Sequence, residues 1–331
     1  MNRWLKRLAI VLLILLVVIF VLPLIVPLPP VGTDPAVFAD PDGRFITVDG
    51  LQTYVREAGD PAGATVILLH GWGGSTFTWR DTIPALAEAG FHVIAFDRPP
   101  YGLSQKTGDL PLSMTEQAAF TAAFMDVLNI SSASLVGHSM GGGVIAYFAV
   151  LYPERVERLG FADGAVRLEN GSGEAGGGGS PGFARAVLNF PPARWWARLG
   201  MRAFLRPYSL ADFQKTAYYD PTVVTDEVIA GYGRALEVTG WDEAILEILT
   251  RNFGDDVPLT DAQIQAIEMS ALIQWGEHDT WVPPALGERL RDLLPNDTYL
   301  TYAQSGHLPM EEEPAAFNSD LIAFLNGSQA N

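Results

Sequence analysis

The chain has 331 residues, of which 48% are hydrophobic, and its formal net charge is −17. This length accommodates one large domain with an insertion, or two small domains. The acidic balance argues against a nucleic-acid partner, and the lack of cysteine in the sequence excludes disulfides, thiolate metal sites and cysteine nucleophiles.

The N-terminus predicts a membrane anchor. Residues 8–26 are apolar apart from Pro23, and three cationic residues precede them: Arg3, Lys6 and Arg7. About 20 apolar residues span a bilayer as a helix, and the cationic flank favours the cytoplasmic side. We therefore expect residues 1–30 to form an uncleaved, single-pass signal anchor with a proline-rich exit, so that the rest of the chain is extracytoplasmic. A cleaved signal peptide is the alternative, but no clear Ala-x-Ala site follows the apolar stretch.

After the anchor, short aliphatic runs alternate with helix-compatible runs. Asp49-Gly50 predicts a hairpin between two strands, and Ser113 with Glu116 forms a capping-box pattern at a helix start. The expected strands cover residues 45–48, 52–57, 65–69, 91–96, 133–136 and 158–162. This alternation predicts an α/β fold with a mainly parallel, doubly wound sheet, whose ligand site lies at the carboxyl ends of the strands.

The alternation stops after Asp163. A Gly- and Ser-rich stretch, residues 171–182, predicts a flexible loop. Helical patterns follow, and strands resume at residues 271–275 and 298–303. We expect a core of residues 40–165 and 266–327, with a helical cap over residues 166–265 inserted after the sixth strand.

The segment Gly137-His138-Ser139-Met140-Gly141 joins an expected strand to an expected helix, which is the nucleophile-elbow pattern. A sharp strand-to-helix turn strains the central residue and leaves room only for very small neighbours. We expect the turn to lift the Ser139 hydroxyl clear of the sheet and to direct the first helix amides towards a developing oxyanion.

A serine nucleophile needs a histidine base that a carboxylate holds in the right tautomer. Among the five histidines, His307 follows a strand and comes last in the chain, whereas His278 precedes the strand-end acid Asp279. We expect His138, inside the elbow, to point away from Ser139. The order Ser139, Asp279, His307 is the order in α/β hydrolases.

These motifs resemble the α/β-hydrolase fold from about residue 45 to residue 325, in the esterase, lipase and C–C hydrolase branch that carries a helical cap. The matching segments are His70-Gly71-Trp72-Gly73-Gly74, Asp97-Arg98 through Gly102 and Ser104, the elbow, Trp275-Gly276-Glu277-His278-Asp279 with Val282-Pro283, and Gly306-His307 with Glu313-Pro314.

The resemblance implies that Ser139 is the nucleophile, His307 the general acid/base and Asp279 the acid that orients His307. It also implies an oxyanion hole formed by the backbone N–H groups of Trp72 and Met140. Asp163 ends a strand and is the alternative acid; a strand-end polar cap is its other interpretation.

Together these features predict a membrane-anchored serine hydrolase that cleaves small-molecule or lipid-like carboxylic esters. Trp195 and Trp196 lie in an apolar, aromatic and cationic segment, so they are candidate contacts to substrate or to the bilayer interface; ordinary helix packing is the alternative. The sequence has no metal, nucleotide or flavin motif, so we expect neither a cofactor nor a metal.

Three other functions stay open. One is hydrolysis of a C–C bond in a β-diketone-type compound, with a substrate carboxylate bound by arginines of the expected cap: Arg185, Arg194, Arg198, Arg202 and Arg206. The second is a cofactor-free haloperoxidase or perhydrolase activity. The third is a catalytically silent binding module.

Overall fold

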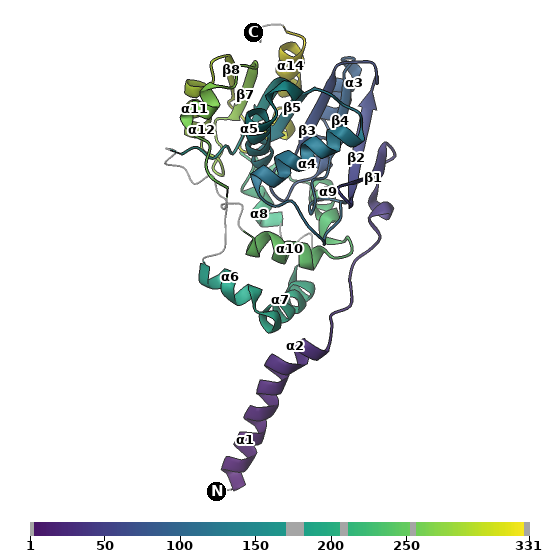
Figure 1. Ribbon diagram of the computed structural model, residues 1–331, viewed down its shortest axis with the longest axis vertical. Helices are drawn as coiled ribbons and strands as arrows, with labels where there is room; N and C mark the ends of the chain where they lie inside the picture. Colours follow the sequence, from purple (N-terminus) through teal and green to yellow (C-terminus); the bar gives the residue numbers. More distant parts are fainter. Residues whose placement is uncertain (1–2, 170–181, 206–210, 252–255, 328–331) are drawn as a thin grey trace.

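The computed structural model describes residues 3–169, 182–205, 211–251 and 256–327. Eight strands form one sheet in the order β1-β2-β4-β3-β5-β6-β7-β8 (Figure 1). Their bounds are β1 Gly43–Val48, β2 Leu51–Gly59, β3 Thr65–Leu69, β4 His92–Phe96, β5 Ala133–His138, β6 Val156–Ala162, β7 Ala271–Gly276 and β8 Asp297–Tyr302. Strand β2 pairs antiparallel with β1 and β4, and the other neighbours are parallel. The predicted mainly parallel sheet is confirmed.

The antiparallel edge begins at the predicted hairpin. Asp49 and Gly50 have φ angles of 46° and 78°, and Val48 pairs with Leu51. Two consecutive left-handed residues give the two-residue turn that matches the twist of the flanking strands. The Asp-Gly pair therefore fixes the register of β1 and β2.

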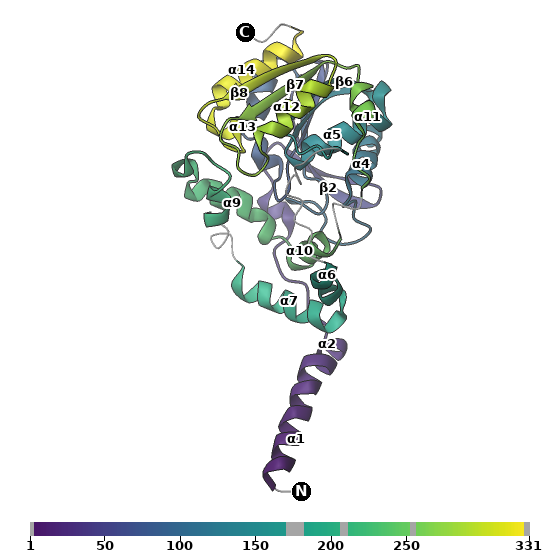
Figure 2. The same ribbon diagram turned by 90° about the vertical axis from the view of Figure 1, so that its left-hand side faces the viewer.

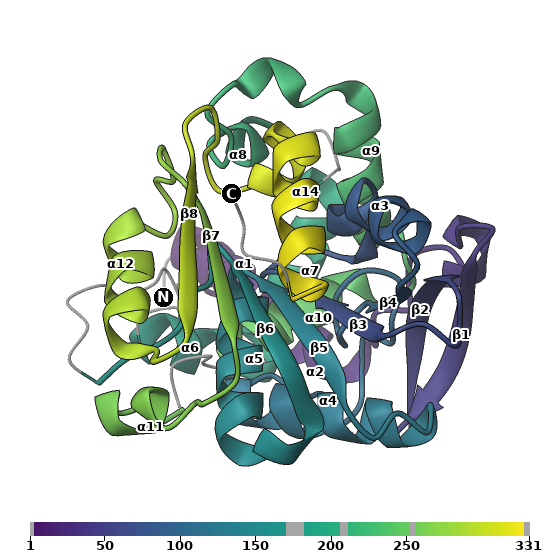
Figure 3. The same cartoon turned by 90° about the horizontal axis from the view of Figure 1, so that it is seen from above.

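Two apolar cores cover the two faces of the sheet. In β3, Ile67 and Leu69 pack into one core, and Val66 and Leu68 pack into the other. Because side chains alternate along a strand, a strand covered on both faces is apolar throughout. Helices α4 (Met114–Val127), α5 (Met140–Leu151) and α12 (Pro284–Leu293) belong to the first core, and α3 (Thr82–Glu88) and α14 (Pro314–Leu325) to the second. Figure 3 shows α4 and α5 across the sheet from α3 and α14.

Between β6 and β7 the chain forms a helical insertion. Its described helices are α6 (Gly182–Asn189), α7 (Pro191–Phe204), α8 (Ala211–Lys215), α9 (Asp226–Gly233), α10 (Trp241–Thr250) and α11 (Asp261–Gln265). Figure 2 places α6, α7, α9 and α10 at one end of the sheet domain, the end nearest α1. The predicted Gly-rich loop lies outside the described residues, except that Gly182 begins α6.

The N-terminal stretch is helical from Arg3 to Ile25 and is apolar enough to cross a membrane, a test that a signal sequence also passes. It consists of α1 (Arg3–Leu16), a π-helical turn (Val17–Val21) and α2 (Leu22–Ile25). This stretch projects from the domain, and none of its side chains is buried (Figure 1). An extended segment then leads to a short 3₁₀ turn, Pro35–Phe38, before β1.

Candidate active site

Ser139 stands at a strained turn between β5 and α5. Its φ of 51° and ψ of −120° lie outside the regions that a non-glycine residue ordinarily adopts. A Cβ on Gly137 would lie 2.3 Å from the Gly141 carbonyl oxygen, and a Cβ on Gly141 would lie 2.3 Å from the Leu69 oxygen. The sequence therefore needs glycine at both positions to bring the elbow against β3.

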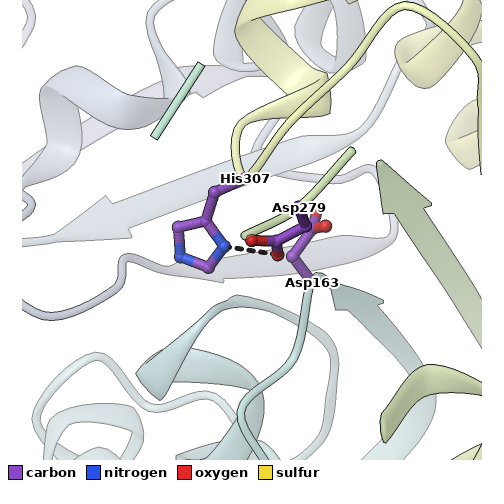
Figure 4. A group of neighbouring side chains, drawn as sticks. All are labelled: Asp163, Asp279 and His307. Atoms are coloured by element: carbon purple, nitrogen blue, oxygen red, sulfur yellow. Dashed lines mark hydrogen bonds and ion pairs between the residues drawn. The ribbon is translucent and has the colours of Figure 1, made fainter. Parts of the chain in front are cut away.

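His307 and Asp279 come from the loops after β8 and β7. His307 Nδ1 lies 2.7 Å from Asp279 Oδ2 (Figure 4). The other carboxylate oxygen, Oδ1, accepts hydrogen bonds from the amides of Trp281 and Val282 at 2.7 and 2.9 Å. This turn fixes the carboxylate, so that His307 donates from Nδ1 and keeps Nε2 available as a base.

Asp163 lies behind Asp279 at the end of β6. It is fully buried, its φ is 46°, and its Oδ1 accepts a hydrogen bond from the Gly276 amide at 3.0 Å. Burial, and then the negative charge of Asp279, raise the pKa of the Asp163 carboxyl well above its ordinary value. The environment of Asp163 therefore favours its neutral form, and Asp279 is the acid that bonds His307.

The same three residues have ligand atoms within 4.8 Å of one another, close enough to hold a metal ion. Their chemistry does not fit one, because His307 Nδ1 already bonds Asp279 and metal binding needs deprotonated ligands. The arrangement is better described as two neighbouring carboxyl groups, one of which holds the imidazole of His307.

The two amides predicted for the oxyanion hole belong to Met140, inside the elbow, and to Trp72, in the loop after β3. Met140 is the first residue of α5, so its N–H is one of the amides that a helix start leaves unpaired. Trp72 lines the cavity together with Ser139 and His307. The oxyanion hole itself stays a prediction.

His70 holds the loop that carries Trp72. Its Nδ1 lies 2.7 Å from the Gly71 oxygen, and its Nε2 lies 3.1 Å from the Arg98 amide. An amide can only donate, so Nε2 is the acceptor and Nδ1 carries the proton. Burial, and then the charge of Arg98, lower the pKa of His70 well below its ordinary value, which keeps this side chain neutral.

The expectation that His138 points away from the site is wrong. Its ring centroid lies 4.7 Å from that of His307, its Nε2 lies 2.8 Å from the His307 carbonyl oxygen, and it lines the cavity. Strand periodicity explains this position, because His138 shares a face of β5 with Val136, two residues earlier. Burial lowers the pKa of His138, so its neutral ring can donate from Nε2 to the His307 loop.

A cavity of about 310 Å³ lies between the elbow and the helical insertion. The insertion contributes mainly apolar side chains, among them Leu205, Phe213, Leu236, Trp241, Ile245 and Ile248. Within the described ranges, Lys106 is the only lysine or arginine that lines it. The Lys106 ammonium donates to the Pro100 oxygen at 2.9 Å and to the Gly102 oxygen. The cavity therefore suits an apolar group next to Ser139.

The structure places Trp195 and Trp196 away from this cavity, which corrects the predicted substrate contact. Neither residue lines the cavity. Their indole nitrogens instead donate to backbone oxygens of the N-terminal segment, Val26 at 2.7 Å and Ile19 at 3.1 Å.

The described arginines of α7 pair with acidic residues of the protein, which differs from the predicted binding of a substrate carboxylate. Arg198 and Arg202 donate from Nε to Asp242 at 2.7 and 2.9 Å, and Arg194 lies 2.6 Å from Glu247. Residues four apart share one helix face, so α7 presents a row of guanidiniums to the acidic side chains of α10. None of the three lines the cavity. Arg185 bonds the Thr250 oxygen at 2.9 Å, and Arg206 lies outside the described residues.

A buried carboxylate that the sequence did not reveal joins the insertion to the core. Glu311 lies on α13 (Pro309–Glu312), and its side chain is 1% exposed. Its carboxylate accepts from Arg80 at 2.8 Å, from the Tyr218 hydroxyl at 2.7 Å and from the Tyr232 hydroxyl. Tyr218 and Tyr232 belong to the insertion and line the cavity. The Glu311 carboxylate thus holds the segments of the insertion that carry Tyr218 and Tyr232 close to the His307 loop.

Comparison with known proteins agrees with this geometry. The model of the alpha/beta hydrolase fold family matches residues 64–314. An uncharacterised hydrolase, YugF, of Bacillus subtilis is 29% identical over 85% of this chain and 97% of its own length. A 2-hydroxy-6-oxononadienedioate/2-hydroxy-6-oxononatrienedioate hydrolase of Paraburkholderia phymatum is 30% identical over 79% of this chain and 86% of its own.

Among solved structures, a membrane phospholipase A superimposes with a TM-score of 0.68 at 24% identity and covers 99% of both chains. A meta-cleavage product hydrolase of Pseudomonas fluorescens gives a TM-score of 0.71 at 25% identity and covers 86% of this chain and 98% of its own. The chain belongs to the α/β-hydrolase family and is a hydrolase.

Proposed function

We propose that this α/β hydrolase is a membrane-anchored serine hydrolase that cleaves carboxylic esters with apolar acyl groups. The observation that carries the proposal is the cavity: a strained serine and the His307–Asp279 pair adjoin a space lined mainly by aliphatic and aromatic side chains. A neutral, apolar ester fits this lining better than a charged substrate does.

The reaction runs in two steps. Ser139 Oγ attacks the ester carbonyl while His307 Nε2 takes its proton, and Asp279 stabilises the imidazolium through Nδ1–H. The C–O bond then breaks, and the leaving alcohol takes the proton from His307. Water, activated by His307, hydrolyses the acyl-enzyme and restores the serine.

The N–H groups of Trp72 and Met140 stabilise the oxyanion in each step. Loss of one such donor typically costs ~10²–10³ in rate. Both are backbone groups, so a change of the Trp72 side chain tests packing instead of the donor.

The second candidate is C–C bond hydrolysis, which the name of the Paraburkholderia relative favours. A dioate carries two carboxylates and needs cationic partners in the cavity. In the described part of the lining, the cation is Lys106, whose ammonium already donates to two carbonyls. This difference favours the ester substrate.

The proposal includes the domain division. Residues 1–30 anchor the chain, residues 40–165 and 266–327 form the core, and residues 166–265 form a cap over the cavity. The cationic residues in the first turns of α1 favour a cytoplasmic N-terminus and an extracytoplasmic hydrolase.

The test compares the full-length protein in detergent micelles with its Ser139→Ala variant. We expect kcat/KM on p-nitrophenyl esters to increase from two-carbon acyl groups to a medium or long chain, and the variant to lose this activity. A 2-hydroxy-6-oxo-dienoate compound is the matched C–C substrate. Turnover of that compound without ester turnover would overturn the ester proposal and keep the serine mechanism.

A further inference from the structure

Helices α6 and α7 expose large apolar side chains on the outside of the insertion. Phe183 and Phe204 are 83% and 81% exposed, so water covers most of each ring unless a partner does. The remaining members of this surface are Val187, Phe190 and Leu199. We call these five residues the apolar face. Helices α6 and α7 pack against each other, and exposed apolar side chains gathered on neighbouring helices mark an interaction surface.

The apolar face continues into the N-terminal helix. Figures 1 and 2 show α7 lying across the end of α2, between the helix and the sheet domain. Trp195 and Trp196 donate to the oxygens of Val26 and Ile19, and the rings of Phe20 and Phe190 have centroids 6.4 Å apart. Helix α7 is therefore attached beside the last turns of the apolar helix.

A proline creates one of these attachment points. In an α-helix the Ile19 oxygen accepts from the amide four residues later, but that residue is Pro23, which has no N–H. Ile19 lies in the π-helical turn Val17–Val21, just before this proline. The Trp196 indole donates to the Ile19 oxygen at 3.1 Å, and lipid offers no donor for that oxygen.

The attachment sets a depth for α7. From Leu8 to Ile25 the helix rises about 27 Å at ~1.5 Å per residue, which approaches the ~30 Å of a bilayer's hydrocarbon core. Ile19 lies six residues before Ile25, about 9 Å along the helix. A helix that contacts Ile19 therefore reaches about 9 Å into the acyl chains, which is within the ~5–10 Å to which an interfacial helix buries its apolar face.

The opposite side of α7 is polar and faces the protein. Arg194, Arg198 and Arg202 are held by Glu247 and Asp242 of α10. Pairing the charges inwards leaves the aromatic side outwards, which is the pattern of a helix lying in a membrane interface.

We infer that the apolar face of α6 and α7 contacts the lipid bilayer. This inference rests on the proposed membrane anchoring and extends it from the N-terminal helix to the insertion. Because α7 pairs with α10 and α10 lines the cavity, the bilayer lies one helix away from the wall of the cavity.

The test uses the full chain, which contains no cysteine, so single cysteines accept a nitroxide label without background. Phe183→Cys and Phe204→Cys report the apolar face. Leu13→Cys reports α1, and Val127→Cys on α4, 47% exposed, is the matched control away from the insertion. Each labelled variant is reconstituted in phosphatidylcholine and phosphatidylglycerol vesicles, and ester hydrolysis checks that it is folded.

Collision rates of the label with oxygen and with a water-soluble nickel complex separate the outcomes. We expect collisions with oxygen to be the more frequent at positions 183 and 204, as at position 13, and collisions with the nickel complex to be the more frequent at position 127. Nickel dominance at 183 and 204 with oxygen dominance at 13 overturns the inference alone. Nickel dominance at 13 as well overturns the anchoring too. Spin–spin broadening at 183 and 204 that disappears on dilution with unlabelled protein assigns the face to a second copy and overturns the inference.

Discussion

The two sides of the cavity are built differently. On the core side, Ser139, Asp279 and His307 stand in turns whose amides, glycines and buried carboxyls leave little freedom. On the insertion side, α7 and α10 are joined by arginine–carboxylate pairs, and several aromatic side chains remain exposed.

This difference separates two tasks. Reacting groups need placement to a fraction of an ångström, and close backbone contacts supply it. In the proposed reaction the insertion has to admit an apolar group, and aliphatic side chains with charged pairs at its edge are sufficient for that. Changes in the core should therefore act on kcat, and changes in the insertion on substrate preference and local stability.

The largest expected effect distinguishes the two buried acids of the core. Asp279→Asn should reduce kcat/KM by ~10⁴, because an amide in this position favours the wrong tautomer of His307. Asp163→Asn should change kcat/KM by less than about tenfold, or 1.4 kcal/mol, since burial raises the pKa of Asp163 and favours its neutral form. Ester kinetics of both variants check this. The reverse order of effects would make Asp163 the acid of the triad.

The second prediction compares one glycine from each side. Gly141→Ala places a methyl group 2.3 Å from the Leu69 oxygen, so we expect a loss of about 3 kcal/mol or more in the free energy of unfolding, together with most activity. Gly200→Ala, in α7 with open space around it, should stabilise by roughly 0.5–1 kcal/mol. Urea unfolding measures both. Equal changes in the free energy of unfolding for the two variants would contradict the difference between the two sides of the cavity.

The third prediction concerns the ion pairs that join α7 to α10. Asp242 is fully buried and bonds two arginines, so Asp242→Asn should cost about 2 kcal/mol and raise KM for long-chain esters more than it changes kcat. Glu243→Gln is the matched control, because this carboxylate is half-exposed and lies 3.5 Å from Arg198. A large fall in kcat for Asp242→Asn, with KM unchanged, would show that the insertion positions the reacting groups.

The smallest effect concerns the pH dependence of stability. The folded pKa of Asp163 is raised, so the folded chain keeps a proton that the unfolded chain loses as pH rises above about 4. This site therefore lowers stability progressively with rising pH, until the folded carboxyl itself ionises. We expect the Tm of Asp163→Asn, relative to the unmodified chain, to increase between pH 4 and pH 8. A constant difference would mean that Asp163 is ionised in the folded state.

Local sequence signals predict the core well. Strand β3 is a run of five apolar or β-branched residues that His70 follows. The structure gives its bounds as Thr65–Leu69, which are the predicted ones. The Ser113 capping box is present as predicted. Buried parallel strands and helix caps depend on neighbouring residues, so their patterns can be read directly.

The remaining features depend on contacts between distant segments. Glu311 meets Tyr218 and Tyr232 about 80 to 93 residues away, and Asp242 meets Arg198 across 44. No local sequence pattern predicts such pairs. Asp163 was visible as a strand-end acid, but its position behind Asp279 follows from the adjacency of β6 and β7. For His138, alternation along β5 was the signal that could have given its direction.

The most direct test of the central claim is to locate the residue that becomes covalently modified. The full-length protein is treated with a long-chain alkyl fluorophosphonate, digested and analysed by mass spectrometry. We expect one adduct, on Ser139, which is absent in Ser139→Ala and forms far more slowly in Asp279→Asn. An adduct on another residue, or none while ester hydrolysis continues, would contradict it.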